Sequence, residues 1–355
     1  MTLLALHEFH HELNGRFSTL NGAEVVNDYG DWLAEHAALT QRAGVIDMSF
    51  RSRLCLLGAD RVRFLHGQVT NDVNRLRPGE GCYAAVVTAK GKLQSDLNVH
   101  RLPDELLLDF EPGFSAAVTQ RLEKFLVADD VEIVDVASQY GLLSAQGPAA
   151  AAVIRALEIF PALPHEPFRF SRVADATLGE IYLMNQPRLG SAGFDLFVPA
   201  NSLGAVMDKL IAGAKSVGGR ACGWRAFETA RIEAGIPRFG IDMTEDHLPQ
   251  ECGIGERAVS YNKGCYIGQE VLNRIHTMGH VNRELRKLNL DEGALPAIGD
   301  RLFHEDREIG YITSVVRSPA TNRNIALGYV RREAGQGETV LVARTAGGKV
   351  SATVQ

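Results

Sequence analysis

Short apolar runs separated by turn formers dominate the first part of the chain and predict strands. The strands predicted in this way are residues 53–58, 82–87, 93–102, 105–110 and 131–136. Gly91 in TAKGK predicts a tight turn, and therefore a hairpin, between the second and third of them. Helical spacing of apolar residues occurs at 59–69 and 113–126. Strands mixed with helices in this order indicate an α+β fold and not strict strand–helix alternation.

The pattern partly repeats along the chain. LLLDFEPGFSAAVTQRLEKFL (106–126) predicts a strand, a proline and a helix, and FDLFVPANSLGAVMDKLIAG (194–213) predicts the same order at nearly the same spacing. Pro112 and Pro199 stand near the expected helix starts, where a missing N–H costs little. The repeat indicates two similar α+β subdomains, although a chance likeness between two common strand–helix units would explain it equally well.

The second half of the chain changes character twice. Residues 223–235 predict a helix that ends at Gly235, and residues 236–282 have little periodicity, which is typical of functional or disordered segments. From Leu285 onward, short strands separated by Gly, Pro or Asn predict an antiparallel barrel of about 70 residues. The predicted domains are a peripheral helical N-terminus (1–40), a first α+β subdomain (41–137), a second one (138–282) and a C-terminal β-barrel (283–355).

Composition narrows the class of protein. With 45% hydrophobic and 23% charged residues and a formal net charge of -6, the chain is a globular protein for which bulk nucleic-acid binding is not expected, although a local basic patch is possible. The five cysteines include no CxxC pair, which argues against a zinc ribbon, a resident iron–sulfur cluster and a disulfide framework. The N-terminus lacks signal-peptide features, and no apolar run reaches the roughly 20 residues that span a membrane. We therefore expect a cytoplasmic protein, a monomer with no membrane partner.

The stretch NKGCYIGQE (262–270) is the strongest candidate for chemistry. Gly264 and Gly268 permit an irregular backbone around Cys265, and Lys263 and Arg274 are positive neighbours of the kind that favour a thiolate. Cys265 is then either a reactive or ligand-donating thiolate, or a small buried residue in a glycine-rich turn.

Other polar residues give weaker signals. His276 and His280 would share one face of a helix as metal ligands do, but two solvated loop histidines explain them better. We likewise expect the histidines near the N-terminus to lie on a solvated helix face; they are His7, His10 and His11. The basic segment 274–287 would suit a phosphate, a polyglutamate tail or an RNA backbone, and an ordinary solvated strand explains it equally well. Asp96 and Asp195 each interrupt a predicted strand.

Several segments, taken in order, resemble the folate-binding YgfZ family, which is related to the glycine-cleavage T-protein (aminomethyltransferase). The segments are AGVIDMS (43–49), HGQVTNDVNRLRPGEG (66–81), AKGKLQSDLNVHRL (89–102), AQGPAA (145–150), ARIEAGIPRFGIDM (230–243) and NKGCYIGQEVLNR (262–274). KGCYIGQE with a following Arg points to the YgfZ branch, and the other segments are shared with the T-protein branch. The resemblance implies two intertwined ferredoxin-like α+β domains and a C-terminal β-barrel around a folate-sized channel.

The resemblance also implies site residues. Asp96 matches the folate-proximal aspartate of the T-protein, and Asp195 matches its pterin-binding glutamate. Phe227 stands where the T-protein has a folate-binding Arg, and PRLGSAG replaces its GYTGEDG segment, so ordinary aminomethyl transfer is not expected. Phe194 and Trp224 are the aromatic types that would flank a pterin.

Three hypotheses follow from these residues and the resemblance. The first is a tetrahydrofolate-dependent factor for assembly or repair of iron–sulfur clusters in client enzymes, including tRNA-modifying ones, with Cys265 as the essential thiol. The residues expected to support that thiol are Lys263, Gln269, Glu270 and Arg274. The second is a folate-dependent one-carbon transferase, aminomethyltransferase-like or demethylase-like, in which Asp96 orients the reacting amine. The third is a non-catalytic scaffold that uses the basic segment 274–287 to bind RNA or protein.

Overall fold

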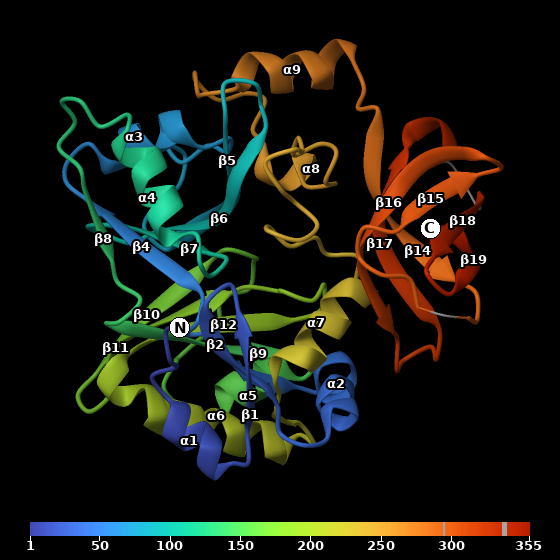
Figure 1. Ribbon diagram of the computed structural model, residues 1–355. Helices are drawn as coiled ribbons and strands as arrows, with labels where there is room; N and C mark the ends of the chain where they lie inside the picture. Colours follow the sequence, from blue (N-terminus) through green and yellow to red (C-terminus); the bar gives the residue numbers. More distant parts are fainter. Residues whose placement is uncertain (294, 336–338) are drawn as a thin grey trace. The chain divides into compact units, whose positions relative to one another are not determined.

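The computed structural model describes residues 1–293, 295–335 and 339–355, which form two compact units (Figure 1). The first unit comprises residues 1–66, 73–83 and 97–230, and the second comprises 67–72, 84–96 and 231–355. In the described residues, no helix has the length and apolar character needed to cross a membrane.

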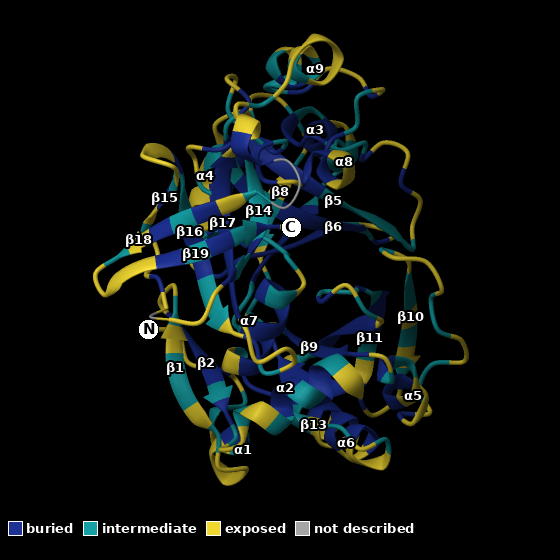
Figure 2. Ribbon diagram, turned by 90° about the vertical axis from the view of Figure 1, so that its right-hand side faces the viewer, coloured by how far each residue is buried: buried dark blue, intermediate teal, exposed yellow. Residues whose placement is uncertain are grey.

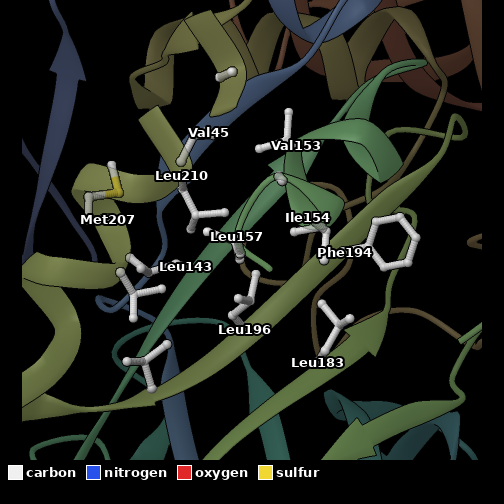
Figure 3. Close-up of a cluster of buried hydrophobic side chains, with 14 of the residues drawn as sticks. Val45, Leu143, Val153, Ile154, Leu157, Leu183, Phe194, Leu196, Met207 and Leu210 are labelled. Carbon is white, nitrogen blue, oxygen red and sulfur yellow. The ribbon is translucent and has the colours of Figure 1, made fainter. Parts of the chain in front are cut away.

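A six-stranded sheet is the centre of the first unit. Its strand order is β10 (Phe170–Asp175), β11 (Gly179–Asn185), β12 (Gly193–Pro199), β9 (Tyr140–Gln146), β3 (Gly44–Asp47) and β13 (Arg220–Ala221). All neighbours are antiparallel except β3 and β13. Apolar side chains on one face pack with α5 (Ala150–Arg155) and α6 (Leu203–Ser216), which follows a short 3-10 turn at Ala200–Ser202 (Figure 3). The opposite face carries a second cluster that contains Phe197 and Phe227.

The hairpin predicted from the sequence belongs to a five-stranded sheet. The order of this sheet is β5 (Glu80–Val87), β6 (Leu93–Arg101), β7 (Leu106–Phe110), β4 (Ser52–Leu57) and β8 (Glu132–Asp135). β5, β6 and the helix α7 (Trp224–Glu233) each contribute residues to both units. The helices α3 (Arg61–Gln68) and α4 (Ser115–Glu123) lie where helical spacing predicts them. The five strands predicted in this part of the chain and these two helices are confirmed.

The prediction of a helical N-terminus over residues 1–40 is wrong for its middle part. Between α1 (His7–Glu12) and α2 (Trp32–Gln41) lies a hairpin of β1 (Arg16–Leu20) and β2 (Ala23–Asp28). Asn21 and Gly22 form its two-residue turn, both with positive φ, and an Asn-Gly pair is the strongest short hairpin signal. His10, expected on a solvated face, is instead fully buried and bonded to Asp47 and Tyr29.

The second unit contains two helices and a barrel in its described part. α8 (Gly255–Ala258) and α9 (Gln269–Met278) precede the barrel, and nearly all of α9 is exposed or half-buried (Figure 2). The strands β14 (Arg283–Leu290), β17 (Asn324–Arg331), β16 (Arg307–Arg317), β15 (Arg301–His304), β18 (Val340–Thr345) and β19 (Gly348–Val354) close in this order, with a 3-10 turn at Arg332–Ala334. Every pairing is antiparallel, and buried aliphatic side chains fill the interior. The mixed α+β class and the antiparallel C-terminal barrel are confirmed.

Candidate functional site

Asp195 lies at the centre of the first candidate site, on β12. Its register partner on β9 is Ser144, whose hydroxyl donates to Asp195 Oδ1 at 2.7 Å. Asp195 has the same strand parity as Phe197, so both face the side of the sheet that holds the second apolar cluster. The carboxylate is 1% exposed, and a charge this deep needs partners that satisfy it.

Arg188 supplies the main partner of Asp195. It lies in the loop between β11 and β12, and its Nε donates to Asp195 Oδ2 at 2.8 Å. Its Nη2 donates to Asp109 Oδ2 on β7 at 2.7 Å, so one guanidinium bridges two carboxylates. The backbone N–H of Arg188 donates to Gln146 Oε1 at 2.9 Å, which holds the loop in place.

Asp109 joins this pair to a second arginine. Arg51 Nε donates to Asp109 Oδ1 at 2.7 Å, and Arg51 Nη1 bonds Glu111 Oε1 at 2.5 Å. Burial alone would raise the pKa of Asp109, but Arg51 and Arg188 outweigh it and hold that pKa well below its usual range. For Asp195 burial prevails and raises the pKa, because the guanidinium of Arg188 is shared with Asp109, whose own charge also opposes ionisation. Two guanidinium groups thus join three carboxylates in a buried charge network.

The side-chain oxygen of Gln186 is an acceptor beside this network that receives no hydrogen bond from the described residues. Asn98 Nδ2 donates to Asp109 Oδ2 at 2.8 Å, so its Oδ1 must accept, and Gln186 Nε2 lies 3.3 Å from that oxygen. This order fixes the amide orientation of Gln186 and leaves its Oε1 buried, with no hydrogen-bond partner among the residues that the structure describes. A buried acceptor of this kind is suited to an N–H group of a ligand.

The aromatic residues predicted for the site separate into two groups. Phe194 alternates with Asp195 along β12 and packs into the apolar cluster on the opposite face of the sheet (Figure 3). It is therefore a core residue and cannot flank a ligand at Asp195. Trp224 and Phe227 belong to the cluster on the face of Asp195, and their rings stack with centroids 5.4 Å apart. Phe50 meets Trp224 edge-on at 5.5 Å.

The KGCYIGQE segment forms the second candidate site, in the second unit. Cys265 is exposed, whereas the other four cysteines are buried or half-buried. Lys263 is buried, and its Nζ donates to the carbonyl oxygens of Val69 at 2.8 Å and Asn71 at 2.9 Å. Its ammonium also lies 4.8 Å from the ring centre of Tyr266. The observed role of Lys263 is to anchor the loop that presents the thiol.

The start of α9 completes this loop. Gln269 Nε2 lies 3.3 Å from the carbonyl oxygen of Lys263 and 3.4 Å from that of Gly264, so the amide closes the turn that contains Cys265. Glu270 and Arg274 are both exposed on α9, one helical turn apart. Lys263 therefore fixes the loop to residues 69 and 71, and Gln269 holds the backbone next to the thiol.

The remaining predicted residues have simple positions. Asp96 is half-buried on β6, in the part of that strand that belongs to the second unit. His276 is exposed on α9 and stacks on Tyr261 at 3.7 Å, and His280 follows after the helix has ended. Within the described residues, no group of three or more His, Cys, Asp and Glu side chains is placed to hold a metal ion.

Sequence reasoning missed most members of the buried charge network. Arg51, Asn98 and Asp109 come from three separate stretches of the chain, and Gln186 and Arg188 come from a fourth. The one available signal is Asp109 inside the apolar run LLLDF, because a carboxylate in a buried strand requires a partner.

Comparisons with known proteins place the chain in a family. Residues 6–263 match the GCVT N-terminal domain, and residues 283–355 match the glycine cleavage T-protein C-terminal barrel domain. An aminomethyltransferase of Shouchella clausii is 28% identical over 98% of this chain and 95% of its own length. Another, from Halalkalibacterium halodurans, is 30% identical over 88% of this chain and 87% of its own length.

The fold agrees with this assignment. The crystal structure of glycine cleavage system aminomethyltransferase T from Bartonella henselae matches with a TM-score of 0.90, at 22% identity, over 100% of this chain and 96% of that one. The two domain matches and the aminomethyltransferase relatives agree with the folate cofactor expected from the sequence, and the YgfZ branch stays a prediction. By its two domain matches and its fold, the chain belongs to the glycine-cleavage T-protein family, related to aminomethyltransferase.

Proposed function

We propose that this protein binds tetrahydrofolate and serves in a folate-dependent one-carbon transfer. The likeness to aminomethyltransferases over nearly the whole chain supports this function. The observation that carries it is Asp195, a buried carboxylate on the same sheet face as the stacked pair Trp224 and Phe227. Tetrahydrofolate, when bound, supplies the carrier of the one-carbon unit.

The residues of the first unit fit a pterin ring. Such a ring presents N–H donors along one edge and two flat faces, which call for buried acceptors and an aromatic or apolar wall. Asp195 and the unpartnered Gln186 Oε1 are acceptors, and Trp224 is a half-buried aromatic side chain. Arg188, which holds Asp195 Oδ2 through N–H groups on one planar carbon, offers the carboxylate the same donor pattern as a pterin edge. We propose that the ligand shares Asp195 with Arg188 or displaces it.

Two further assignments rest on the resemblance. Asp96 is proposed to orient the reacting amine. Phe227 stands in place of the folate-binding arginine of the T-protein and stacks on Trp224, so ordinary aminomethyl transfer is not the proposed reaction.

Titration calorimetry of the full chain with tetrahydrofolate tests the cofactor. We expect Asp195→Asn to weaken binding by about 1.5–3 kcal/mol, the usual range for hydrogen bonds to a charged group. Asp208→Asn is a matched control, because Asp208 is an exposed aspartate of α6 in the same unit. Absence of binding to the wild type would remove tetrahydrofolate from the proposal.

Cys265 supports a second candidate function. An exposed cysteine on an anchored loop suits a role in assembly or repair of iron–sulfur clusters in cytoplasmic client enzymes, including tRNA-modifying ones. Such a role needs the thiol, whereas folate-dependent transfer to an amine does not. We expect Cys265→Ser to abolish rescue of an iron–sulfur enzyme in cells that lack this protein, and Cys82→Ser to retain it. Full rescue by Cys265→Ser would exclude the thiol from this function.

A further inference from the structure

The outer face of the C-terminal barrel carries a hollow of about 900 Å³ that the proposed functions leave unused. Arg331 is the ladder partner of Arg283, and Tyr329, two residues earlier on β17, is the partner of Tyr311. Arg301 on β15 is in turn the partner of Tyr311. Because side chains alternate along strands, these residues share one face, opposite the interior residue Val330.

The charges around this hollow are unbalanced. Arg283 pairs with Glu251 at 3.1 Å, and Arg301 pairs with Glu308 at 3.5 Å. Glu333 also lines the hollow, but it pairs at 2.9 Å with Arg307, which does not line it. Arg331 and the adjacent Arg332 are exposed, and neither side chain has a hydrogen bond or ion pair with any residue that the structure describes.

The strand register places two arginines opposite each other, and a bound anion would relieve their electrostatic repulsion. Arg331 stands directly opposite Arg283, and like charges at opposed ladder positions destabilise a sheet. A bound anion between such guanidinium groups converts repulsion into two charge-assisted interactions. The barrel therefore keeps a local arrangement that favours a negatively charged ligand.

Tyr311 can donate a hydrogen bond into the hollow because His247 donates to its hydroxyl oxygen. The backbone N–H of Thr244 donates to His247 Nδ1 at 3.1 Å, so this nitrogen is an acceptor. Burial lowers the pKa of His247 to about 4, so the ring is neutral near pH 7 and carries its proton on Nε2. Nε2 lies 2.8 Å from the Tyr311 hydroxyl and donates to it. The hydroxyl proton of Tyr311 is then available to an acceptor in the hollow.

The basic segment 274–287 does not supply this site by itself. Arg286 pairs with Glu284 at 3.4 Å, and Lys287 Nζ donates to the carbonyl oxygen of Glu233 at 2.9 Å. Among the arginine and lysine side chains of this segment, only that of Arg283 lines the hollow, where Glu251 already pairs with it. The uncommitted positive charge comes from Arg331 and Arg332, at the end of β17 and beyond it.

We propose that this hollow binds a short oligoanion, a ligand with two or more adjacent phosphate or carboxylate groups. Arg331 and Arg332 bind the anionic groups, Tyr311 donates a hydrogen bond to one of them, and Arg301, 5.7 Å from the centre of the Tyr311 ring, borders that contact. The volume lies in the upper range of small-molecule sites and exceeds what one inorganic ion fills. The site lies wholly within the second unit and is independent of the proposed folate site.

Titration calorimetry of the full chain with inorganic triphosphate and with tri-γ-glutamate tests this site and distinguishes phosphate from carboxylate sources. We expect at least one of the probes to bind, more weakly at high salt because screening weakens exposed ionic contacts. Arg331→Gln and Arg332→Gln should each weaken binding about tenfold, and the double variant more. Tyr311→Phe should weaken it several-fold. Arg155→Gln, at an exposed arginine of α5, should leave it unchanged.

Three results would overturn the proposal. They are the absence of binding of both probes to the wild type at low salt, equal binding by the Arg331→Gln/Arg332→Gln variant, and an equal loss in Arg155→Gln. Binding of a ten-nucleotide single-stranded RNA without binding of either short probe would also count against it, because the site would then serve a long polyanion. Circular dichroism of each variant establishes that the barrel is folded.

Discussion

Replacing Asp109 with Asn tests the charge network of the first unit most directly. Asp109 Oδ1 accepts from Arg51 at 2.7 Å, and Oδ2 accepts from Asn98 at 2.8 Å and Arg188 at 2.7 Å. An amide accepts at only one of its two polar atoms, so its NH₂ group must face at least one of these donors. Both arginines lose their shared carboxylate in a buried site. We therefore expect Asp109→Asn to lower the free energy of unfolding by about 3–5 kcal/mol.

The pH dependence of this effect has a definite sign. Arg51 and Arg188 hold the folded-state pKa of Asp109 below its unfolded value of about 3.9. A depressed folded-state pKa contributes stability that is fully present above the unfolded value and is lost as the pH falls through the folded one. The difference in free energy of unfolding between wild type and Asp109→Asn should therefore be largest at pH 7 and decrease as the pH falls below about 4.

Asp195→Asn is the matched comparison. Burial raises the pKa of Asp195, so its ionised form weakens the folded state increasingly as the pH rises above the unfolded value. Arg188 keeps Asp109 in this variant, and an amide at 195 still offers one acceptor. We expect a loss of at most about 1 kcal/mol at pH 7. Similar losses in the two variants, or a loss below about 1 kcal/mol in Asp109→Asn, would refute the argument.

Urea unfolding followed by tryptophan fluorescence is a suitable assay for both variants. The two tryptophans, Trp32 and Trp224, both lie in the first unit, which also contains the network. Their emission therefore reports on the unit that the substitutions affect, separately from the barrel.

Two further predictions concern the loop that carries Cys265. Gly268→Ala should destabilise the start of α9 by more than about 2 kcal/mol, because φ is +87° and a Cβ would lie 2.6 Å from the carbonyl oxygen of Thr88. Gly253→Ala, at φ +71° with open space, should cost only about 1–2 kcal/mol; equal thermal shifts by circular dichroism would contradict the steric argument. Lys263→Met should speed proteolytic cleavage within residues 260–268, since it removes the ammonium that donates hydrogen bonds to two backbone carbonyls. The exposed Lys349→Met is its control, and equal cleavage rates would exclude the anchoring role.

The strands and the barrel could be predicted from the sequence because local chemistry determines them. Apolar runs bounded by Gly, Pro or Asn have few alternatives to a strand. The N-terminal hairpin follows the same rule, and Asn21-Gly22 is its signal in the sequence. His10 departs from its expected place for a different reason. Its burial depends on Asp47 and Tyr29, which lie 37 and 19 residues away, so no local pattern predicts it.

In the candidate sites, too, some features follow from the local sequence and others depend on residues distant in the chain. The exposure of Cys265 contradicts the alternative of a small residue buried in a glycine-rich turn. Phe194 is next to Asp195 in the sequence, yet adjacency on a strand places two side chains on opposite faces. Phe227 lies on the face of Asp195 although 32 residues separate them in the sequence. Strand parity alone therefore excludes Phe194 from a ligand site at Asp195, whereas only the folded chain brings Phe227 to that face.

Arg188 connects stability with the proposed ligand site. Two apolar strands each contain a carboxylate, Asp109 in LLLDF and Asp195 in GFDLF, and neither can be buried without a cation. One guanidinium from the loop between β11 and β12 serves both. The same guanidinium bonds the carboxylate that a pterin edge would need. A stronger Arg188–Asp195 ion pair therefore stabilises the folded state but opposes binding of a ligand at Asp195. Asp109 makes this arrangement workable, because Arg188 retains one carboxylate when a ligand takes the other.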